Sequence, residues 1–332
     1  MKRVGCRQLH GWKVLKIKSS SSQIAKLEIL AAISGVLIAL QSKANGELSH
    51  LLGNSTEAAL VSFGSGLIVI SLIAPFNNSI KQGMRNLRVA VAAKQIPRWR
   101  LFAGVLGGSF VALQTQVVPL IGVALYSVAS IAGQTAMSLI VDRIGLTGGG
   151  KKLISKRRVT AALITVFAVL VSALDRISLA SFSVIAVALA TLAGALVGVQ
   201  RALNGQINEY SKASFTTSFL NFFMGTSVLV VMLFALLLIK GNEIVALPSG
   251  PWWIYTGGTV GVIYIAFTST IVQHLGVLTF TLFSVGGTLV GSLLIDVFSP
   301  TNGNTVSWYL VSGIAMTYLG VVIGGQSRLF KR

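Results

Sequence analysis

The sequence carries little charge for its length of 332 residues. Lys, Arg, Asp and Glu together make up 11% of it, against about 25% in soluble globular domains. Hydrophobic residues make up 53%, and the mean hydropathy is +0.79. These values exclude an ordinary water-soluble domain and indicate a chain that lies mostly within a lipid bilayer.

Residues that support metal, disulfide or catalytic chemistry are also scarce. Cys6 is the single cysteine, so the chain can form neither an internal disulfide nor a cysteine-based zinc site. The three histidines, His10, His50 and His274, are too widely spaced to indicate a cluster of metal ligands. Paired catalytic carboxylates, a Ser-His-Asp arrangement and a P-loop are missing as well. The sequence therefore predicts no enzymatic activity, no metal site and no cofactor.

Apolar runs of bilayer-spanning length fill most of the chain. A transmembrane helix needs about 20 apolar residues, and the alternating ten-residue pattern of a membrane β-barrel is missing. The predicted fold class is an all-α integral membrane protein with ten transmembrane helices. We expect these helices near 27–47, 56–75, 99–118, 120–141, 158–174, 182–204, 213–239, 252–272, 274–297 and 306–326.

Acidic residues are few, and the basic residues are unevenly placed. The chain has 8 Asp and Glu against 27 Lys and Arg, which gives a formal net charge of +19. In the ten-helix arrangement 24 of the 27 basic residues fall on one side of the membrane, and Lys43, Arg176 and Lys240 fall on the other. Because cytoplasmic loops carry the excess of Lys and Arg, both termini are predicted to be cytoplasmic. This asymmetry explains the basic balance without a nucleic-acid partner.

Each half of the chain contains a copy of the same pattern. Gly35, Gln41, Asn45 and Gly46 recur 159 residues later as Gly194, Gln200, Asn204 and Gly205. Further along, the offset is 154 residues, and it relates Gly104, Gly107, Gly133, Ser138 and Asp142 to Gly258, Gly261, Gly287, Ser292 and Asp296. Each half holds five predicted helices, an odd number, so the second half enters the membrane from the opposite side. The sequence thus predicts two inverted five-helix repeats, a pattern typical of transporters.

The predicted organisation has five segments. They are a basic cytoplasmic N-terminal tail at 1–26, a first five-helix repeat at 27–174, a linker at 175–181, a second five-helix repeat at 182–326 and a cytoplasmic C-terminal tail at 327–332. The first segment has no acidic residue, a composition that an organelle transit peptide shares. Both interpretations of it, tail and targeting segment, stay open.

Polar side chains inside the apolar spans are the candidate binding residues. Gln41 and Asn45 are four residues apart and so share one helix face, and Gln200 and Asn204 repeat this spacing. An uncharged amide both donates and accepts hydrogen bonds, which suits a polar or zwitterionic solute. The alternative is that these amides hydrogen-bond one helix to another. Further candidates in other spans are Gln114, Gln134 and Asn221.

Acidic residues near the spans are candidates for coupling transport to protons. Glu47 is the acid closest to the repeated motif, and its counterpart Gln206 cannot titrate. The alternative for Glu47 is a solvated carboxylate at the outer end of its helix. Asp142 and Asp296 end equivalent helices, and solvation at the membrane surface is the expectation for both.

Small residues and a proline predict how the helices pack and turn. Pairs of glycines four residues apart let helix backbones approach closely, so they predict packing seams. Pro119 lies between two predicted helices, where we expect a tight turn. The glycine pairs are Gly104/Gly108, Gly194/Gly198, Gly257/Gly261, Gly287/Gly291 and Gly320/Gly324.

The motif Gly-x5-Gln-x3-Asn-Gly, present once in each half, resembles the YdcZ-like branch of the drug/metabolite transporter superfamily, which is EamA-like. The run from Ile131-Ala132-Gly133-Gln134 to Asp142 resembles it too. The resemblance covers about residues 27–326, and the chain looks like a fused tandem form of a five-helix unit. It implies a ten-helix inverted-repeat carrier of small metabolites or drugs, and it names no particular substrate.

We therefore expect a secondary transporter in the plasma (bacterial inner) membrane that works by alternating access. Export and proton coupling are expectations from the resemblance. The expected partners are a small-molecule substrate and the lipid bilayer, with no nucleic acid and with a homodimer left open. The alternative is a membrane scaffold or assembly factor that transports nothing.

Overall fold

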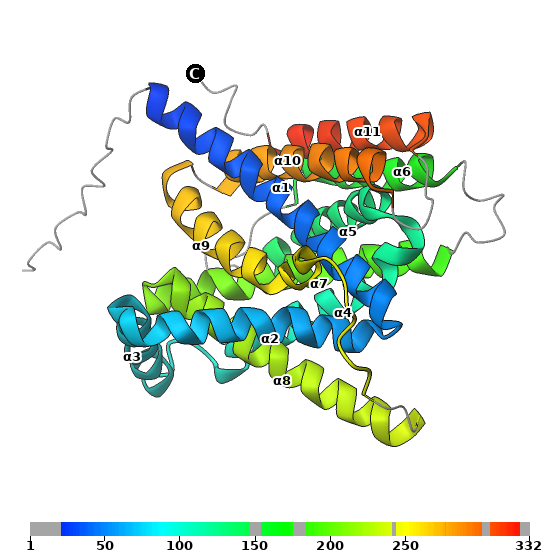
Figure 1. Cartoon of the computed structure of the whole chain (residues 1–332). Helices are drawn as coiled ribbons and strands as arrows, with labels where there is room; N and C mark the ends of the chain where they lie inside the picture. The colour runs from blue at the N-terminus through cyan, green and yellow to red at the C-terminus, as the bar shows by residue number, and fades with distance from the viewer. Residues whose placement is uncertain are drawn as a thin grey trace, which may run out of the picture.

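The computed structural model describes residues 21–146, 154–174, 184–240, 244–275, 277–300 and 306–325. All regular structure in this part of the chain is helical, as the sequence predicts (Figure 1). The linker expected at 175–181 and the C-terminal tail at 327–332 lie outside the described residues, as does most of the N-terminal tail.

Ten long helices correspond one to one with the predicted spans. Of these, seven are long and apolar enough to cross a membrane by length and composition, counting only the described residues: α1, α2, α4, α5, α7, α8 and α10. The bounds of the ten helices are α1 (Ser21–Leu52), α2 (Ser55–Ile73), α4 (Ala103–Ile121), α5 (Val123–Ile144), α6 (Lys156–Ala173), α7 (Val184–Ser211), α8 (Ser214–Lys240), α9 (Gly257–Leu275), α10 (Val277–Phe298) and α11 (Trp308–Gly325). The protein is thus a multi-pass membrane protein.

A helix that the sequence analysis missed joins α2 to α4. After a short turn η1 (Ala74–Phe76), α3 spans Asn78–Ala92 in a stretch expected to be a basic loop. The Asn77 side chain caps its start by accepting a hydrogen bond from the Ser79 backbone nitrogen. Ile80 and Leu87 lie on the buried face of α3, and the basic residues of this helix lie outside that face. A search for long apolar runs cannot detect such a helix, because only one of its faces is apolar.

A side-chain cap and a glycine with positive φ set where other helices begin and end. The Asn54 side chain accepts hydrogen bonds from the backbone nitrogens of Thr56 and Glu57 at the start of α2. Gly122, at a φ of 80°, separates α4 from α5, a conformation that favours glycine. The turn predicted at Pro119 is therefore wrong: Pro119 lies inside the last turn of α4, and the chain breaks at Gly122. Two further short 3-10 helices, η2 (Arg98–Phe102) and η3 (Trp252–Tyr255), precede α4 and α9.

Helices from the two halves of the chain pack against each other. In the first half α1 contacts α9 and α10, and in the second half α7 contacts α4 and α5. The pair α6 and α11 forms a further contact between the halves, next to α10 in Figure 1. Most of the core is therefore built between the halves, not within either one.

Glycines make the closest of these crossings. A Cβ on Gly35 would overlap the backbone oxygen of Ser284 in α10, and a Cβ on Gly287 would overlap that of Ala32 in α1. The equivalent residues repeat this geometry: Gly194 meets Ser130, and Gly133 meets Thr191. Gly104/Gly108, Gly194/Gly198, Gly257/Gly261 and Gly287/Gly291 all lie against another helix, which confirms these four pairs as packing seams.

Connections that the sequence places on the same side of the membrane meet at the same end of the bundle. At one end the Asn86 side chain donates to the Ser211 carbonyl at 3.0 Å, and Gln206 bonds both Arg100 and the Leu146 carbonyl. At the other end the backbone nitrogen of Val245 donates to the Glu57 carboxylate. These contacts agree with the predicted grouping of loops. Which end faces the cytoplasm stays a prediction.

Candidate functional site

The first of two amide clusters is buried and joins α1 to α4. The Asn45 side-chain nitrogen donates to the Gln114 side-chain oxygen at 2.8 Å, and Gln114 in turn donates to the Ser42 hydroxyl at 2.8 Å. Asn45 is 0% exposed and Gln114 is 1% exposed. Because water cannot reach these amides, their hydrogen bonds hold the two helices in a fixed register.

Helix α9 of the other half closes over this cluster with glycines. An alanine Cβ at Gly261 would lie 3.0 Å from the Gln41 side-chain nitrogen, and one at Gly257 would overlap the Asn45 side-chain oxygen. The Ser62 hydroxyl of α2 lies against the same glycine, 2.9 Å from that Cβ position. Glycine is therefore the residue that lets α9 cover the amides without displacing them.

Two polar atoms of this first cluster are left without partners. The side-chain oxygen of Asn45 and the hydroxyl of Ser62 are buried and have no hydrogen-bond partner among the described residues. A buried unsatisfied polar group costs about 1–3 kcal/mol. A hydrogen-bond acceptor and a hydroxyl are thus available beside Gly257 to any group that could reach them.

The second amide cluster joins α7 to α8. Asn221 links the repeated residues: it accepts from the Gln200 side-chain nitrogen at 2.8 Å and donates to the Asn204 side-chain oxygen at 2.7 Å. Helix α4 of the first half covers it with glycines, because Gly107 abuts Gln200 and Gly104 abuts Asn221. Each cluster is therefore covered by a glycine face that comes from the opposite half.

The two clusters occupy equivalent places in the two halves, but their hydrogen bonds connect different helices. In the first half the repeated Asn45 bonds Gln114 in α4. The residue of the second half that corresponds to Gln114 is Thr268, and its hydroxyl donates to the Tyr264 carbonyl of its own helix at 2.7 Å. In the second half the partner of the repeated asparagine is Asn221 in α8, whose counterpart is Ser62. The sequence shows these exchanges of residue type, but the partners depend on how the helices pack.

One predicted candidate lies apart from both clusters. The Gln134 side chain, in α5, bonds the Ser130 hydroxyl of its own helix at 3.3 Å. The other six candidates, Gln41, Asn45, Gln114, Gln200, Asn204 and Asn221, divide between the two clusters. The amides of the first cluster are buried, so this cluster is closed in this conformation, whereas Gln200 and Asn204 of the second cluster are partly exposed.

Glu47 forms an ion pair within α1. Its carboxylate lies 3.3 Å from the Lys43 ammonium, one helical turn away in α1. The Lys43 side chain is only 9% exposed and the Glu47 side chain 27% exposed. Lys43 also lines a cavity of about 430 Å³ between α1 and α10, with Leu40, Trp253 and Leu294 among its apolar walls. The spacing of four residues between opposite charges was the signal for this pair.

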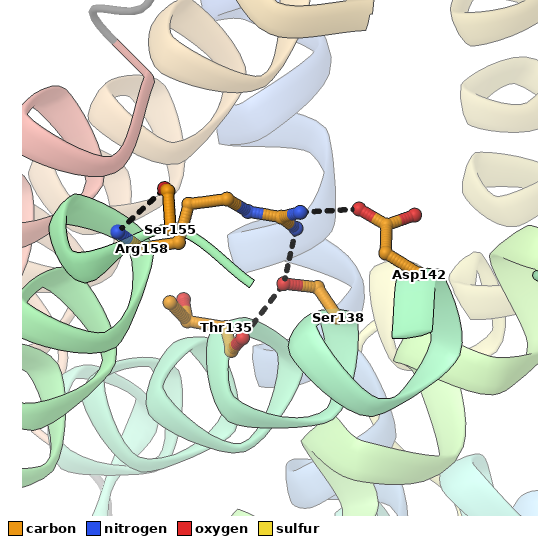
Figure 2. A network of polar contacts seen from close by, with 5 residues as sticks. All are labelled: Thr135, Ser138, Asp142, Ser155 and Arg158. Atoms are coloured by element: carbon orange, nitrogen blue, oxygen red, sulfur yellow. Dashed lines mark hydrogen bonds and ion pairs between the residues drawn. The ribbon is translucent and has the colours of Figure 1, made fainter. Parts of the chain in front are cut away.

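The expectation of a solvated Asp142 is wrong. Its carboxylate lies 2.6 Å from the Arg158 guanidinium, and its side chain is only 14% exposed. Figure 2 shows Arg158 reaching from α6 to Asp142 and to Ser138, whose hydroxyl donates to the Thr135 carbonyl at 2.7 Å. The Ser155 hydroxyl caps the start of α6 through the Arg158 backbone nitrogen. This network ties α5 to α6 inside the first half.

The expectation of a solvated Asp296 is wrong too, for a different reason. Asp296 is 3% exposed, and its two oxygens accept hydrogen bonds from the backbone nitrogens of Val123 and Ala124 at 3.1 and 2.8 Å. These are two of the first nitrogens of α5, which have no partner within that helix. The negative charge also suits the positive end of the helix dipole. Asp296 thus anchors α10 to a helix of the other half.

The comparisons with known proteins agree with this architecture. A solved structure titled "Crystal structure of protein" is similar over 92% of this chain and 96% of its own, with a TM-score of 0.52 and 15% sequence identity. At that identity the likeness shows the fold alone. No curated protein sequence matches the chain.

A family model gives the sharper result. The model described as "Putative inner membrane exporter, YdcZ" matches residues 27–171 and, a second time, residues 185–323. These two matches cover nearly all of both five-helix units predicted from the sequence. They confirm the resemblance drawn from the Gly-x5-Gln-x3-Asn-Gly motif. The chain therefore belongs to the YdcZ family that this model describes, in a tandem form with one copy of the family unit in each half.

Proposed function

We propose that this protein is a secondary transporter that exports small polar metabolites or drugs across the plasma (bacterial inner) membrane by alternating access. The family supports a membrane transporter in general. The observation that carries the finer proposal is the position of the two amide clusters, each covered by glycines of the opposite half. A site between two repeats is where transporters of this general kind bind their solutes.

The proposed topology has ten membrane spans in two inverted five-helix repeats, with both termini in the cytoplasm. Three of these spans, α6, α9 and α11, are proposed from their packing beside the seven more apolar helices. The reciprocal crossings of Gly35 with Ser284 and of Gly194 with Ser130 support the inversion, because equivalent residues of the two halves meet equivalent partners. The distribution of basic residues supports the orientation.

The proposed mechanism exchanges amide contacts for solute contacts. In the closed conformation Asn45 bonds Gln114, while the side-chain oxygen of Asn45 and the hydroxyl of Ser62 stay unsatisfied. A polar solute that enters between the halves supplies partners for these atoms, which favours its binding there. The smooth glycine faces let the halves rock against each other, so the clusters open to one side at a time.

Proton coupling through Glu47 is part of the proposal. Glu47 is the acid nearest the first cluster, and its pair with Lys43 gives the carboxylate a cation when the proton is released. Lys43 and Glu47 lie on one helix and move together, but rocking of the halves would change the access of water to the Glu47 carboxylate, because α1 packs against α9 and α10 of the other half. Movement of the proton would thereby follow the movement of the halves.

Flux measurement on the purified full chain tests the proposal. A thermal-shift screen of polar metabolites and drugs first selects compounds that stabilise the protein. Radiolabelled hits are then followed in proteoliposomes. Accumulation or exchange that Gln41→Ala and Gln200→Ala reduce, while the yield of folded protein stays near that of the wild type, supports the assignment. Normal flux in both variants overturns the site, and no flux for any stabilising compound favours a scaffold or assembly factor.

A further inference from the structure

Helix α3 lies at a membrane surface. It connects α2 and α4, both of which are apolar enough to cross the membrane, so it sits outside the hydrocarbon core. Three contacts hold it against the turn between α7 and α8. The Thr216 hydroxyl donates to the Ile80 carbonyl at 3.2 Å, the Asn86 side chain donates to the Ser211 carbonyl, and Gly83 abuts Ala213.

One face of α3 carries three basic side chains. Lys81, Arg85 and Arg88 are four and three residues apart, which places them on the same face, and all three are exposed. Within the part of the chain that the structure describes, none of the three has a hydrogen bond or an ion pair. The sequence has no acidic residue between Glu57 and Asp142. The positive charge of this face is therefore not balanced by its own segment.

The three basic residues form one wall of a pocket. Its volume is about 820 Å³, and its other walls are mainly apolar, with Pro75, Ile80, Met84 and Phe219 among them. Glu209, the acid on the neighbouring helix α7, does not line this pocket. The pocket thus combines a cluster of cations with an apolar floor.

An apolar rim continues from the pocket along the end of α2. Leu72 is 67% exposed and Phe76 is 90% exposed, and both lie at the end of the apolar span Ser55–Phe76. Side chains of this size are stable at such exposure when they lie against lipid acyl chains. The positive wall and the apolar rim therefore meet where the headgroup layer of a bilayer meets its hydrocarbon.

We propose that this pocket binds the headgroup of an anionic phospholipid. Lys81, Arg85 and Arg88 pair with its phosphate, since charge-assisted hydrogen bonds from Arg and Lys suit phosphate oxygens. The acyl chains lie against Leu72 and Phe76. The apolar rim favours a lipid over a soluble phosphate compound, which would gain nothing from these two side chains.

The test measures lipid binding without transport. Purified full-length protein is mixed with phosphatidylcholine vesicles that contain or lack phosphatidylglycerol carrying a fluorescent headgroup, and bound lipid is read by energy transfer from the protein's tryptophans. The variant Lys81→Gln/Arg85→Gln/Arg88→Gln is expected to lose about 100-fold in affinity for phosphatidylglycerol. A matched control, Arg98→Gln/Arg143→Gln/Lys156→Gln, removes three exposed cations from outside the pocket. It should change the affinity by no more than about threefold.

A second variant separates a lipid from a free anion. Leu72→Ser/Phe76→Ser keeps all three cations but removes the apolar rim, and it should weaken phosphatidylglycerol binding while the protein keeps its melting temperature. Equal affinity of the triple variant and the wild type for phosphatidylglycerol overturns the proposal. So does full displacement of the lipid by millimolar inorganic phosphate together with unchanged binding by the rim variant, which would identify a site for a soluble anion.

Discussion

Asp296, near the end of α10, lies with one carboxylate oxygen 2.8 Å from the backbone nitrogen of Ala124, at the start of α5. The residues are 172 positions apart, and they belong to different halves of the chain. A helix that begins in the first half is thus capped by a side chain of the second half. The two halves are joined by hydrogen bonds to a charged group as well as by apolar packing.

Replacing Asp296 with alanine should lower the stability of the protein. The variant loses two hydrogen bonds at the start of α5 and leaves two buried nitrogens unsatisfied, and loss of a helix cap alone costs about 0.5–2 kcal/mol. Asp296→Asn keeps one acceptor and should lose less. The measurement is the melting temperature in detergent. Equal melting of Asp296→Ala and the wild type would show that the cap contributes nothing.

Glycines of one helix should differ sharply in their tolerance of alanine. A Cβ at Gly194 overlaps the backbone of Ser130, so Gly194→Ala should force α7 away from α5 and reduce the yield of folded protein. Gly205 in the same helix has nothing within 4 Å of its Cβ position. Gly205→Ala should therefore be neutral or slightly stabilising, because alanine favours helix over glycine by about 1 kcal/mol. Similar yields of the two variants would contradict the close crossing.

The Asn45–Gln114 hydrogen bond should appear as coupling in a double-mutant cycle. Asn45→Ala, Gln114→Ala and the double variant are compared by unfolding in mixed micelles, with an expected coupling of about 0.6 kcal/mol and an upper value of about 1.7. Gln134 belongs to neither cluster. A control cycle of Asn45→Ala with Gln134→Ala should therefore be additive. Coupling in the control cycle as large as in the test cycle would argue against a direct bond.

The proposed topology predicts opposite accessibility for two exposed serines. In a Cys6→Ser background, Ser79→Cys lies between α2 and α4 and should react with an impermeant thiol reagent from the cytoplasmic side only. Ser249→Cys lies between α8 and α9 and should react from the outer side of intact cells. Permeabilised cells, in which both cysteines should react, serve as the control. Reaction of both from the same side of sealed membranes would refute the inverted ten-helix arrangement.

Glu47→Gln should abolish accumulation driven by a pH gradient and leave substrate exchange intact. A glutamine cannot release a proton, but it can keep the helix packed. Glu28→Gln, which removes an acid from the other end of the same helix, is the matched control and should keep the pH response. Because Glu47→Gln takes the ion-pair partner from Lys43, the variant Lys43→Gln/Glu47→Gln checks for a loss of folding. An unchanged pH response in Glu47→Gln would exclude Glu47 as the carrier.

The sequence predicted the long helices well because each is an apolar run, and an apolar run of that length has few alternatives in a membrane. It missed α3 because the apolar residues Ile80 and Leu87 are separated by basic ones. The turn was wrongly predicted at Pro119, because the last turn of α4 tolerates this proline. The helix ends at Gly122 instead.

The sequence predicted which residues form the candidate site, but not which side chains hydrogen-bond to one another. The four-residue spacing placed Gln41 with Asn45 and Gln200 with Asn204, but no pattern along the chain could show that Asn45 bonds Gln114 or that Asn221 joins the other pair. The burial of Asp296 was hidden for the same reason. A carboxylate at a helix end looks solvated until the partner helix is placed beside it.

The different hydrogen bonding of the two amide clusters has a consequence for the orientation of a bound solute. In a homodimer of identical units every substitution occurs in both copies, so a solute on the symmetry axis meets the same groups on either side. Fusion of the units into one chain removes that restriction. Here the first half has Gln114 where the second half has Thr268, and the second half has Asn221 where the first half has Ser62. A solute held between the clusters, as we propose, meets unlike groups at its two ends. It should therefore bind in one orientation, with the same end of the solute always against the Asn45–Gln114 cluster.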